Sequence, residues 1–422
     1  MKGLRLALFA LGTALLTTTA MAQTELRITH ATTGGAEKVV LDEIVAAFEA
    51  ANPDIKVKQI PFDDDTYSDT GLITQLQGAD VPDIYFQWAG FPVARDAQAG
   101  YAVDLTDALA TDGWGDTFVP SVWTAGAGTM FEGKVYMIPT SLDVTNTIWY
   151  NKTIFAENNL TPPKTWDEFV TVIKTLVAAG ETPIIEGNQE FWPFGNWASH
   201  IAAKVVPPDE YKAAFSQTGK FSTPGFEKAL GYIQQLHDIG AFNKDMAGLG
   251  ADPAMATFLE GAAVMHPIGS WLIGTAKELA DADFQYGEFD TPVIDPDHPL
   301  KDSVIGTVTG WVVDAKSQHK AEAIKFLKFY TSFDNQVKRA ESGSLSPIKG
   351  VNEAAKLDDQ TKAMAAMLAN APTMVPPPDT TYPVPVAEAY YQAAAMVATG
   401  EKSPKDALVW LDDNVAQIAK AN

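Results

Sequence analysis

The chain has 422 residues, no cysteine, 30 basic and 53 acidic residues, and a formal net charge of −23 at pH 7. The lack of cysteine excludes a disulfide framework, thiolate metal sites and a thiol nucleophile, and the acidic charge argues against binding to nucleic acid or to anionic membrane surfaces. The length suggests two domains rather than a single core.

Residues 1–22 have the features of a secretory signal. The basic start MKGLR precedes the apolar run LALFALGTALL, and the segment ends on AMA with small residues at Ala20 and Ala22. We expect cleavage after Ala22, which removes Lys2 and Arg5 and leaves 422 − 22 = 400 residues with a net charge of 28 − 53 = −25. No later apolar run has transmembrane length, and no cysteine is present for a lipid anchor. The sequence therefore predicts a soluble protein of the periplasm of a double-membraned bacterium.

The first part of the mature chain alternates strands and helices. Hydrophobic periodicity predicts strands at 25–31, 55–62 and 81–90, with helices at 36–53 and 70–80 between them. The segment VPDIYFQWAG is apolar almost throughout, as in a buried parallel strand. This order predicts a doubly wound α/β lobe. Ligands in such lobes lie beyond the carboxyl ends of the strands, which places near one rim Gly34, Asp65, Tyr67, Gln87 and Trp88.

The rest of the chain is predicted to be mostly helical, with two strands. One strand begins near 134, breaks at Pro139 and resumes as TNTIWYNK before it enters a helix. Thr165 and Glu168 form a capping box at the clearest helix start, and helices dominate from there to about 280. Further along we expect a strand at 303–314, an amphipathic helix at 320–333, and an irregular proline-rich connection at 372–392.

Several motifs for metal or cofactor chemistry fail on inspection. Residues 128–135, GTMFEGKV, nearly match a phosphate-binding loop, but Val135 stands where a magnesium-binding hydroxyl is needed, so a β-turn is favoured. The acidic stretch 63–69 has Tyr67 where a calcium ligand belongs, which favours a solvated turn or a ligand loop. No zinc-hydrolase helix and no G-x-S-x-G nucleophile elbow occurs. We therefore expect no catalytic residue, no metal site and no cofactor.

Several segments in order resemble the family-one extracellular solute-binding proteins of ABC importers, the group that includes maltose-binding protein. The resemblance covers nearly the whole mature chain and rests on these stretches: VLDEIVAAFEAANPDIKVKQI, ADVPDIYFQWAG, GKVYMIPTSLDVTNTIWYNKTIFAENNL, PKTWDEF, FLEGAAVMHPIGSW and AIKFLKFYTS. It implies two α/β lobes joined by crossing segments, with the ligand held between them. The substrates of this family are mostly sugars and oligosaccharides, and occasionally glycerol phosphodiesters.

The resemblance also implies a domain division and partners. We assign residues 1–22 to the signal, 23–138 plus 290–333 to lobe one, and 139–289 plus 334–422 to lobe two. The expected motion is closure of the lobes about the crossing segments. The expected partners are a small carbohydrate and the permease subunits of an ABC transporter in the inner membrane, and we expect a monomer.

The candidate ligand residues follow from the same resemblance. Trp88 and Trp271 match positions of sugar-facing aromatic side chains, with Ser270 as a hydroxyl partner beside Trp271. Asp143 matches a position that often bonds sugar hydroxyls, although a solvated hinge carboxylate is the alternative. The remaining candidates are Asp65 and Tyr67 in the loop after the second strand, Gln87, and the pair Gly310 and Trp311, where packing is an equal alternative for Trp311.

The stretch EFWPFGNWASH, residues 190–200, contributes two further candidates. Pro193 and Gly195 argue against a continuous helix, and Asn196 is suited to cap a new one with Trp197 at its first position. Trp197 fits the family's place for a sugar platform, and Trp192 is the second candidate. The sequence leaves open which of these two tryptophans faces the ligand.

Two alternatives to a sugar receptor stay open. The first is a receptor for another solute, such as a glycerol phosphodiester, a polyamine or an anionic sugar. The mature chain has only three arginines, Arg27, Arg95 and Arg339, and bidentate binding of anions favours arginine, so a neutral ligand is preferred. The second alternative is a secreted carbohydrate-active enzyme, which would share an aromatic cleft.

Overall fold

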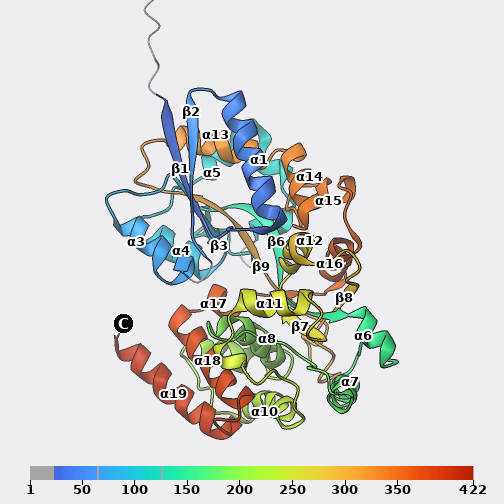
Figure 1. Cartoon of the computed structure of the whole chain (residues 1–422). Helices are drawn as coiled ribbons and strands as arrows, with labels where there is room; N and C mark the ends of the chain where they lie inside the picture. Colours follow the sequence, from blue (N-terminus) through green and yellow to red (C-terminus); the bar gives the residue numbers. More distant parts are fainter. Residues whose placement is uncertain (1–22, 64–65, 125–126, 422) are drawn as a thin grey trace, which may run out of the picture.

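The computed structural model describes residues 23–63, 66–124 and 127–421. The predicted signal segment 1–22 and the candidate residue Asp65 lie outside the described residues. Within the described ranges, no helix is both long and apolar enough to cross a membrane. In the same ranges, no group of three or more His, Asp or Glu side chains is placed to hold a metal ion. Figure 1 shows two bodies, the upper with β1, β2 and α1 and the lower with α8, α10, α18 and α19.

The main sheet has the strand order β2-β1-β3-β9-β6-β7. Strands β1 (Thr24–His30), β2 (Ile55–Pro61) and β3 (Ile84–Trp88) are parallel, and α1 (Gly35–Ala51) and α3 (Leu72–Gln77) connect them. This confirms the predicted alternation of strands and helices, which arises because each strand is apolar on faces that helices cover.

Two long strands run from one body into the other. The first half of β6 (Ile138–Asn151) pairs with β9 (Val304–Val313), which in turn pairs with β3. The second half of β6 pairs with β7 (Met265–Ile268) and β8 (Tyr286–Phe289) in the lower body. The short strand β10 (Met374–Val375) joins the start of β9. The backbone therefore crosses between the bodies side by side, through one hydrogen-bonded sheet.

The near match to a phosphate-binding loop is a hairpin. Strands β4 (Met130–Phe131) and β5 (Lys134–Val135) pair in antiparallel fashion. The two residues between them, Glu132 and Gly133, have φ of 49° and 79°, as a tight two-residue hairpin turn requires. The predicted β-turn is confirmed.

Lobe one is defined by the buried cluster that contains Leu26, Ile28, Phe48, Trp311 and Phe326. Helices α1, α13 (Lys320–Tyr330) and α14 (Phe333–Ser342) surround this cluster. We expected residues from 334 onward in lobe two. However, Ala340, Ile348 and Val351 also belong to this cluster, because α14 packs beside α1 and α15 (Val351–Ala354) packs against α14.

Lobe two is defined by a second buried cluster, which contains Phe169, Phe194, Trp197, Leu230 and Tyr390. A third cluster, with Val144, Trp149, Phe258, Ile273 and Met364, joins the crossing strand to the neighbouring helices.

The remaining α-helices complete the two lobes. They are α4 (Phe91–Gln98), α5 (Thr106–Ala110), α6 (Lys152–Glu157), α7 (Trp166–Ala179), α8 (Trp192–Ala203), α9 (Pro208–Phe215), α10 (Pro224–Asp238), α11 (Ala251–Leu259), α12 (Leu272–Leu279), α16 (Asp359–Asn370), α17 (Pro378–Thr381), α18 (Val384–Ala398) and α19 (Pro404–Ala421). Short 3-10 or π segments lie at Tyr67–Gly71, Thr111–Thr117, Pro120–Trp123 and Met246–Gly248.

The starts of α7 and α18 test two local predictions, of which the first is confirmed and the second is wrong. The capping box at Thr165 and Glu168 is present at the start of α7, which confirms that prediction. The segment 372–392 was expected to be irregular, yet α18 begins at Val384 within it. Pro385 lies in the first turn of α18, where a missing N–H costs no helical hydrogen bond.

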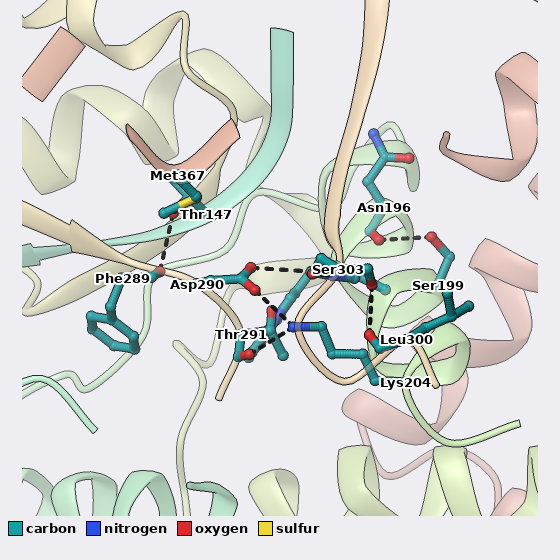
Figure 2. Close-up of polar contacts among 12 residues, drawn as sticks. Thr147, Asn196, Ser199, Lys204, Phe289, Asp290, Thr291, Leu300, Ser303 and Met367 are labelled. Atoms are coloured by element: carbon teal, nitrogen blue, oxygen red, sulfur yellow. Dashed lines mark hydrogen bonds and ion pairs between the residues drawn. The ribbon is translucent and has the colours of Figure 1, made fainter. Parts of the chain in front are cut away.

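The connection from β8 to β9, residues 290–303, was expected in lobe one, but hydrogen bonds tie both of its ends to α8 of lobe two. The Lys204 ammonium donates to the Asp290 carboxylate at 2.7 Å and to the Thr291 carbonyl at 3.0 Å (Figure 2). The His200 Nε2 lies 3.0 Å from the Ser303 carbonyl and donates to it. His200 lies in the last turn of α8, and Lys204 is the C-cap residue that directly follows the helix.

Candidate functional site

Three strands bring an aromatic side chain and two hydroxyls into one row. Trp88, the last residue of β3, stands opposite Thr309 of β9, and Thr309 stands opposite Ser141 of β6. Directly opposite residues of neighbouring strands have side chains on the same face. Trp88 is half-buried and ends a parallel strand, where ligands bind in open α/β sheets.

Asp143 is the ionisable group of this row. Its carboxylate oxygens accept hydrogen bonds from the Ser141 hydroxyl at 2.7 Å and from the Thr309 hydroxyl at 2.8 Å. Burial raises the pKa of Asp143 above its ordinary value, and Glu37 adds to the rise, whereas the two hydroxyls and Arg339 oppose it. A carboxylate offers about four lone-pair sites, and the side chain stays partly exposed. It can therefore accept further hydrogen bonds from a ligand.

A network around Arg339 supports the row from the lobe-one side. The Arg339 guanidinium donates to the Thr140 carbonyl and, at 3.4 Å, to the Ser344 hydroxyl. It also lies over the Tyr330 ring, 5.2 Å from the centroid. The Ser344 hydroxyl donates to the Glu37 carboxylate at 2.6 Å. These contacts fix the crossing strand one residue before Ser141, and with it the position of Asp143.

Residues of lobe two lie beside the crossing strand, next to Asp143. The Ser270 N–H donates to the carbonyl of Val144, the residue after Asp143, at 2.8 Å. Trp271 follows, precedes the first residue of α12, and lies over Gly269, where an added Cβ would meet the indole at 1.9 Å. The half-buried rings of Trp271 and Trp192 have centroids 5.9 Å apart. Ser270 and these two tryptophans are therefore close to one another and next to the crossing strand.

Trp197 is a core residue, which corrects the expectation of a sugar platform. Its side chain is fully buried, its indole N–H donates to the Thr291 hydroxyl at 3.1 Å, and its ring packs against Phe169, Phe194 and Phe242. Trp192 is the partly exposed tryptophan of this pair.

The helix around these two tryptophans starts earlier than predicted. Phe191 takes a φ of 64°, and α8 begins at Trp192, so Pro193 lies in the first turn, where proline is tolerated. The helix continues through Gly195. Glycine is needed there to make room for Tyr391, because a Cβ at this position would lie 2.2 Å from an atom of the Tyr391 ring. Asn196 does not cap the helix, and its side chain accepts a hydrogen bond from the Tyr391 hydroxyl at 2.8 Å.

Tyr67 and Gln87 point into the protein rather than toward the row. The Tyr67 hydroxyl donates to the Phe86 carbonyl at 2.6 Å, and its side chain is fully buried. The Gln87 amide donates to the buried Asp96 carboxylate at 2.6 Å. Both candidates are therefore structural in this conformation. The Tyr67 ring lies 6.1 Å from the Trp88 ring and supports it.

Gly310 and Trp311 serve packing in this structure, which is the alternative that the sequence left open for Trp311. An added Cβ at Gly310 would lie 2.1 Å from the Ile138 carbonyl oxygen, so the glycine allows β9 to approach β6. Trp311 is 3% exposed and packs against Phe86 and Tyr330 in the lobe-one core.

The sequence missed Ser141, Thr309, Glu37 and Ser344. Ser141 and Thr309 are 168 residues apart in the chain, and only the β6–β9 register brings them together. The signal that was available is the Ser-x-Asp spacing at 141–143, because residues two apart in a strand share a face.

The three arginines of the described chain are engaged within the protein. Arg27 pairs with Asp80, Arg95 pairs with Asp96, and Arg339 has the contacts described above. Each guanidinium already has a hydrogen-bonding or ionic partner, so this arrangement offers a ligand hydroxyls, one carboxylate and aromatic faces.

Comparison with known proteins gives a family match and several relatives. The family model described as bacterial extracellular solute-binding protein matches residues 34–337. The multiple sugar-binding protein of Streptococcus mutans is 30% identical over 330 residues, which cover 74% of this chain and 73% of that protein. An uncharacterized ABC transporter extracellular-binding protein of Pyrococcus horikoshii is 27% identical over 331 residues, covering 77% and 70%.

Solved structures share the architecture at lower identity. A chitin oligosaccharide binding protein superposes with a TM-score of 0.84 and 23% identity, covering 95% of this chain and 100% of the other. The maltose/maltodextrin-binding domain from Bdellovibrio bacteriovorus, bound to maltotriose, has a TM-score of 0.75 and 21% identity, covering 94% and 100%. These likenesses confirm the predicted two-lobed α/β binding-protein fold.

Proposed function

The chain belongs to the bacterial extracellular solute-binding proteins, and we propose that it is the receptor of an ABC importer for a neutral sugar or oligosaccharide. It captures the sugar between its lobes in the periplasm and delivers it to the membrane permease as a monomer. The names of relatives support this, because they include a multiple sugar-binding protein and ABC transporter binding proteins.

The observation that best supports a sugar ligand is the set of side chains in the row and in the lobe-two residues beside it, Ser270, Trp271 and Trp192. A sugar ring has apolar C–H faces and a fringe of hydroxyls, so aromatic faces and hydrogen-bond acceptors bind it together. We propose that Trp88, Trp192 and Trp271 contact ring faces, and that Asp143 and Ser270 bond the hydroxyls. Asp65 lies outside the described residues, and its role stays a prediction.

The same groups disfavour a charged solute. A phosphodiester or an anionic sugar calls for arginine or lysine near the ligand, yet Arg339 is held by Thr140 and Ser344. A polyamine requires several acceptor carboxylates, whereas in the row one carboxylate, Asp143, is already bonded to two hydroxyls.

We propose further that the bound sugar leaves unchanged. Family members bind solutes, and a receptor that delivers cargo has no use for covalent chemistry. The secreted-enzyme alternative predicts that oligosaccharide is cleaved when it is incubated with the protein. Chromatography of the sugar after overnight incubation separates the two functions, because any new product overturns the receptor proposal.

The binding proposal is tested by calorimetry against a panel of monosaccharides and oligosaccharides. We expect tight one-to-one binding to at least one neutral sugar. Native mass spectrometry of protein purified without added ligand narrows the panel, since retained cargo adds its own mass. Binding of an amino acid or polyamine, together with no binding of any neutral carbohydrate, would falsify the proposal.

The mass of the exported protein tests the signal segment, because cleavage after Ala22 leaves Gln23 as the first residue.

A further inference from the structure

We propose that two adjacent residues of α12, Lys277 and Glu278, form a clasp that holds the lobes together. Helix α12 packs with lobe two, because Leu272, Ile273 and Ala276 lie in the cluster with Trp149 and Phe258. In Figure 1 it lies at the junction of the two bodies, next to α1 and α14 of lobe one. The clasp residues contact those two helices at opposite helix ends.

Glu278 contacts the start of α1. Its carboxylate accepts the backbone N–H of Gly35, the first residue of that helix, at 2.5 Å. The residue before it, Gly34, has no side chain that could cap the helix. The first N–H groups of a helix have no partner within the helix, and the positive end of its dipole favours a carboxylate. Lobe two therefore supplies the cap that lobe one lacks.

Lys277 contacts the end of α14. Its ammonium donates to the Glu341 carbonyl, in the last turn of that helix, at 2.7 Å. The last carbonyls of a helix are unpaired and form its negative end, which favours a cation. The same ammonium pairs with Asp358, the cap of α16, at 2.6 Å. The charges of Lys277 and Glu278 thus match the two helix ends that they meet.

Glycine at the end of α14 lets α12 come close to it. At the start of α1 the fit is an ordinary van der Waals contact, because a Cβ added to Gly35 would lie 3.7 Å from the Gly274 carbonyl of α12. Gly343, which follows α14 with a φ of 121°, would place a Cβ 3.0 Å from the Ile273 side chain. Helix α12 is therefore in direct contact with both lobe-one helices.

Helix α12 joins the clasp to the proposed ligand site, and this part of the inference rests on the proposed function. Trp271 precedes the helix, and Glu278 lies in its last turn. A ligand that holds Trp271 toward lobe one also holds the clasp residues against α1 and α14. The clasp adds its own free energy to the closed state, so it raises ligand affinity without touching the ligand.

The experiment measures lobe separation without any sugar. The chain has no cysteine, so Lys325→Cys on α13 and Lys174→Cys on α7, both exposed, accept spin labels at these two positions alone. Pulsed electron paramagnetic resonance then gives the distance distribution between lobes. We expect Glu278→Gln to lower the ratio of closed to open molecules by about two- to fivefold, the range for an exposed helix-end charge. Lys277→Met should act in the same direction.

Glu43→Gln is the matched control, because Glu43 is an exposed carboxylate on α1 and its loss changes the net charge equally. Thermal unfolding followed by circular dichroism confirms that each variant is folded. Identical distance distributions in the Glu278→Gln and Glu43→Gln proteins overturn the clasp, whatever the sugar panel shows. A shift in distances without any sugar binding supports the clasp and removes the sugar proposal, so the two failures are distinguishable.

Discussion

At the scale of single residues, Asp143 is the group on which sugar affinity should depend most. It is the carboxylate of the row, held by Ser141 and Thr309. We expect Asp143→Asn to weaken binding of the preferred sugar about 10- to 100-fold, because a hydrogen bond to a charged group contributes about 1.5–3 kcal/mol. Calorimetry measures the change, with Asp334→Asn, at an exposed position of α14, as control. Equal affinities of wild type and Asp143→Asn would remove Asp143 from the site.

Asp143 should also make binding depend on pH. The ionised form accepts hydroxyl hydrogen bonds best, and burial raises the pKa of this group. Affinity should therefore fall as pH decreases, and the fall should begin above the pH at which an ordinary aspartate protonates. The effect on folding has the opposite sign, because a raised pKa favours the protonated native state at low pH and this contribution is lost as pH rises. Calorimetry from pH 4 to pH 8 tests this, and the Asp143→Asn protein should lack the change.

Alanine substitutions of the two tryptophans in residues 190–200 should have different effects, one on sugar affinity and the other on stability. Trp192→Ala removes a half-buried ring next to Trp271, so we expect weaker sugar binding and little change in unfolding. Trp197→Ala empties a fully buried site and should lower the free energy of unfolding by about 3–5 kcal/mol. Urea denaturation and calorimetry on both variants test this assignment. A reversed pattern would place Trp197 at the ligand.

At the scale of elements, α8 anchors the connection from β8 to β9 at both ends. Lys204 is 1% exposed and bonds Asp290 and Thr291 (Figure 2). His200 bonds Ser303. Burial and the neighbouring Lys204 charge hold the pKa of His200 well below its ordinary value, so the ring is neutral. This connection leads into β9, the strand that carries Thr309, so its anchoring fixes the start of a crossing segment.

Removing Lys204 should therefore destabilise the protein strongly. Lys204→Met leaves the Asp290 carboxylate without its counter-charge, and breaking a buried pair in this way costs about 3–5 kcal/mol. The double variant Lys204→Met, Asp290→Leu removes both charges and should recover most of the loss. Urea denaturation of the wild type, both single variants and the double variant gives the coupling. Additive losses in the double variant would show that the pair does not act as a unit.

Much of the element order could be predicted, because strand alternation and the Thr165–Glu168 capping box are local signals. Packing partners could not be predicted. Nothing near Ala340 in the sequence indicates that α14 packs beside α1, and the pairing of Ser141 with Thr309 depends on a register between distant segments. Gly195 was misread for a similar reason, since its small size serves the Tyr391 ring, almost two hundred residues away.

At the scale of the whole molecule, the net charge should affect the stability of the protein but have little effect on its affinity for a neutral sugar. The mature chain is expected to have a net charge of 28 − 53 = −25, while its arginines are paired within the protein. Like charges repel across the surface and destabilise the compact state. Salt reduces this repulsion, because the Debye length falls from about 10 Å at 0.1 M to about 3 Å at 1 M. Stability should therefore rise with salt.

Sugar affinity, in contrast, should change little with salt. A neutral ligand exchanges hydrogen bonds with water for hydrogen bonds with Asp143 and Ser270, and it releases no counterion. We expect the dissociation constant to change by no more than about fivefold between 50 mM and 500 mM sodium chloride, because salt screens the charges of the clasp, whose effect on closure is about two- to fivefold, while the urea midpoint of the same protein increases. Calorimetry and urea denaturation on one preparation measure both. A loss of affinity of tenfold or more at high salt would indicate a charged ligand, a polyamine or an anionic solute, because it exceeds the effect of about two- to fivefold that screening of the clasp can have.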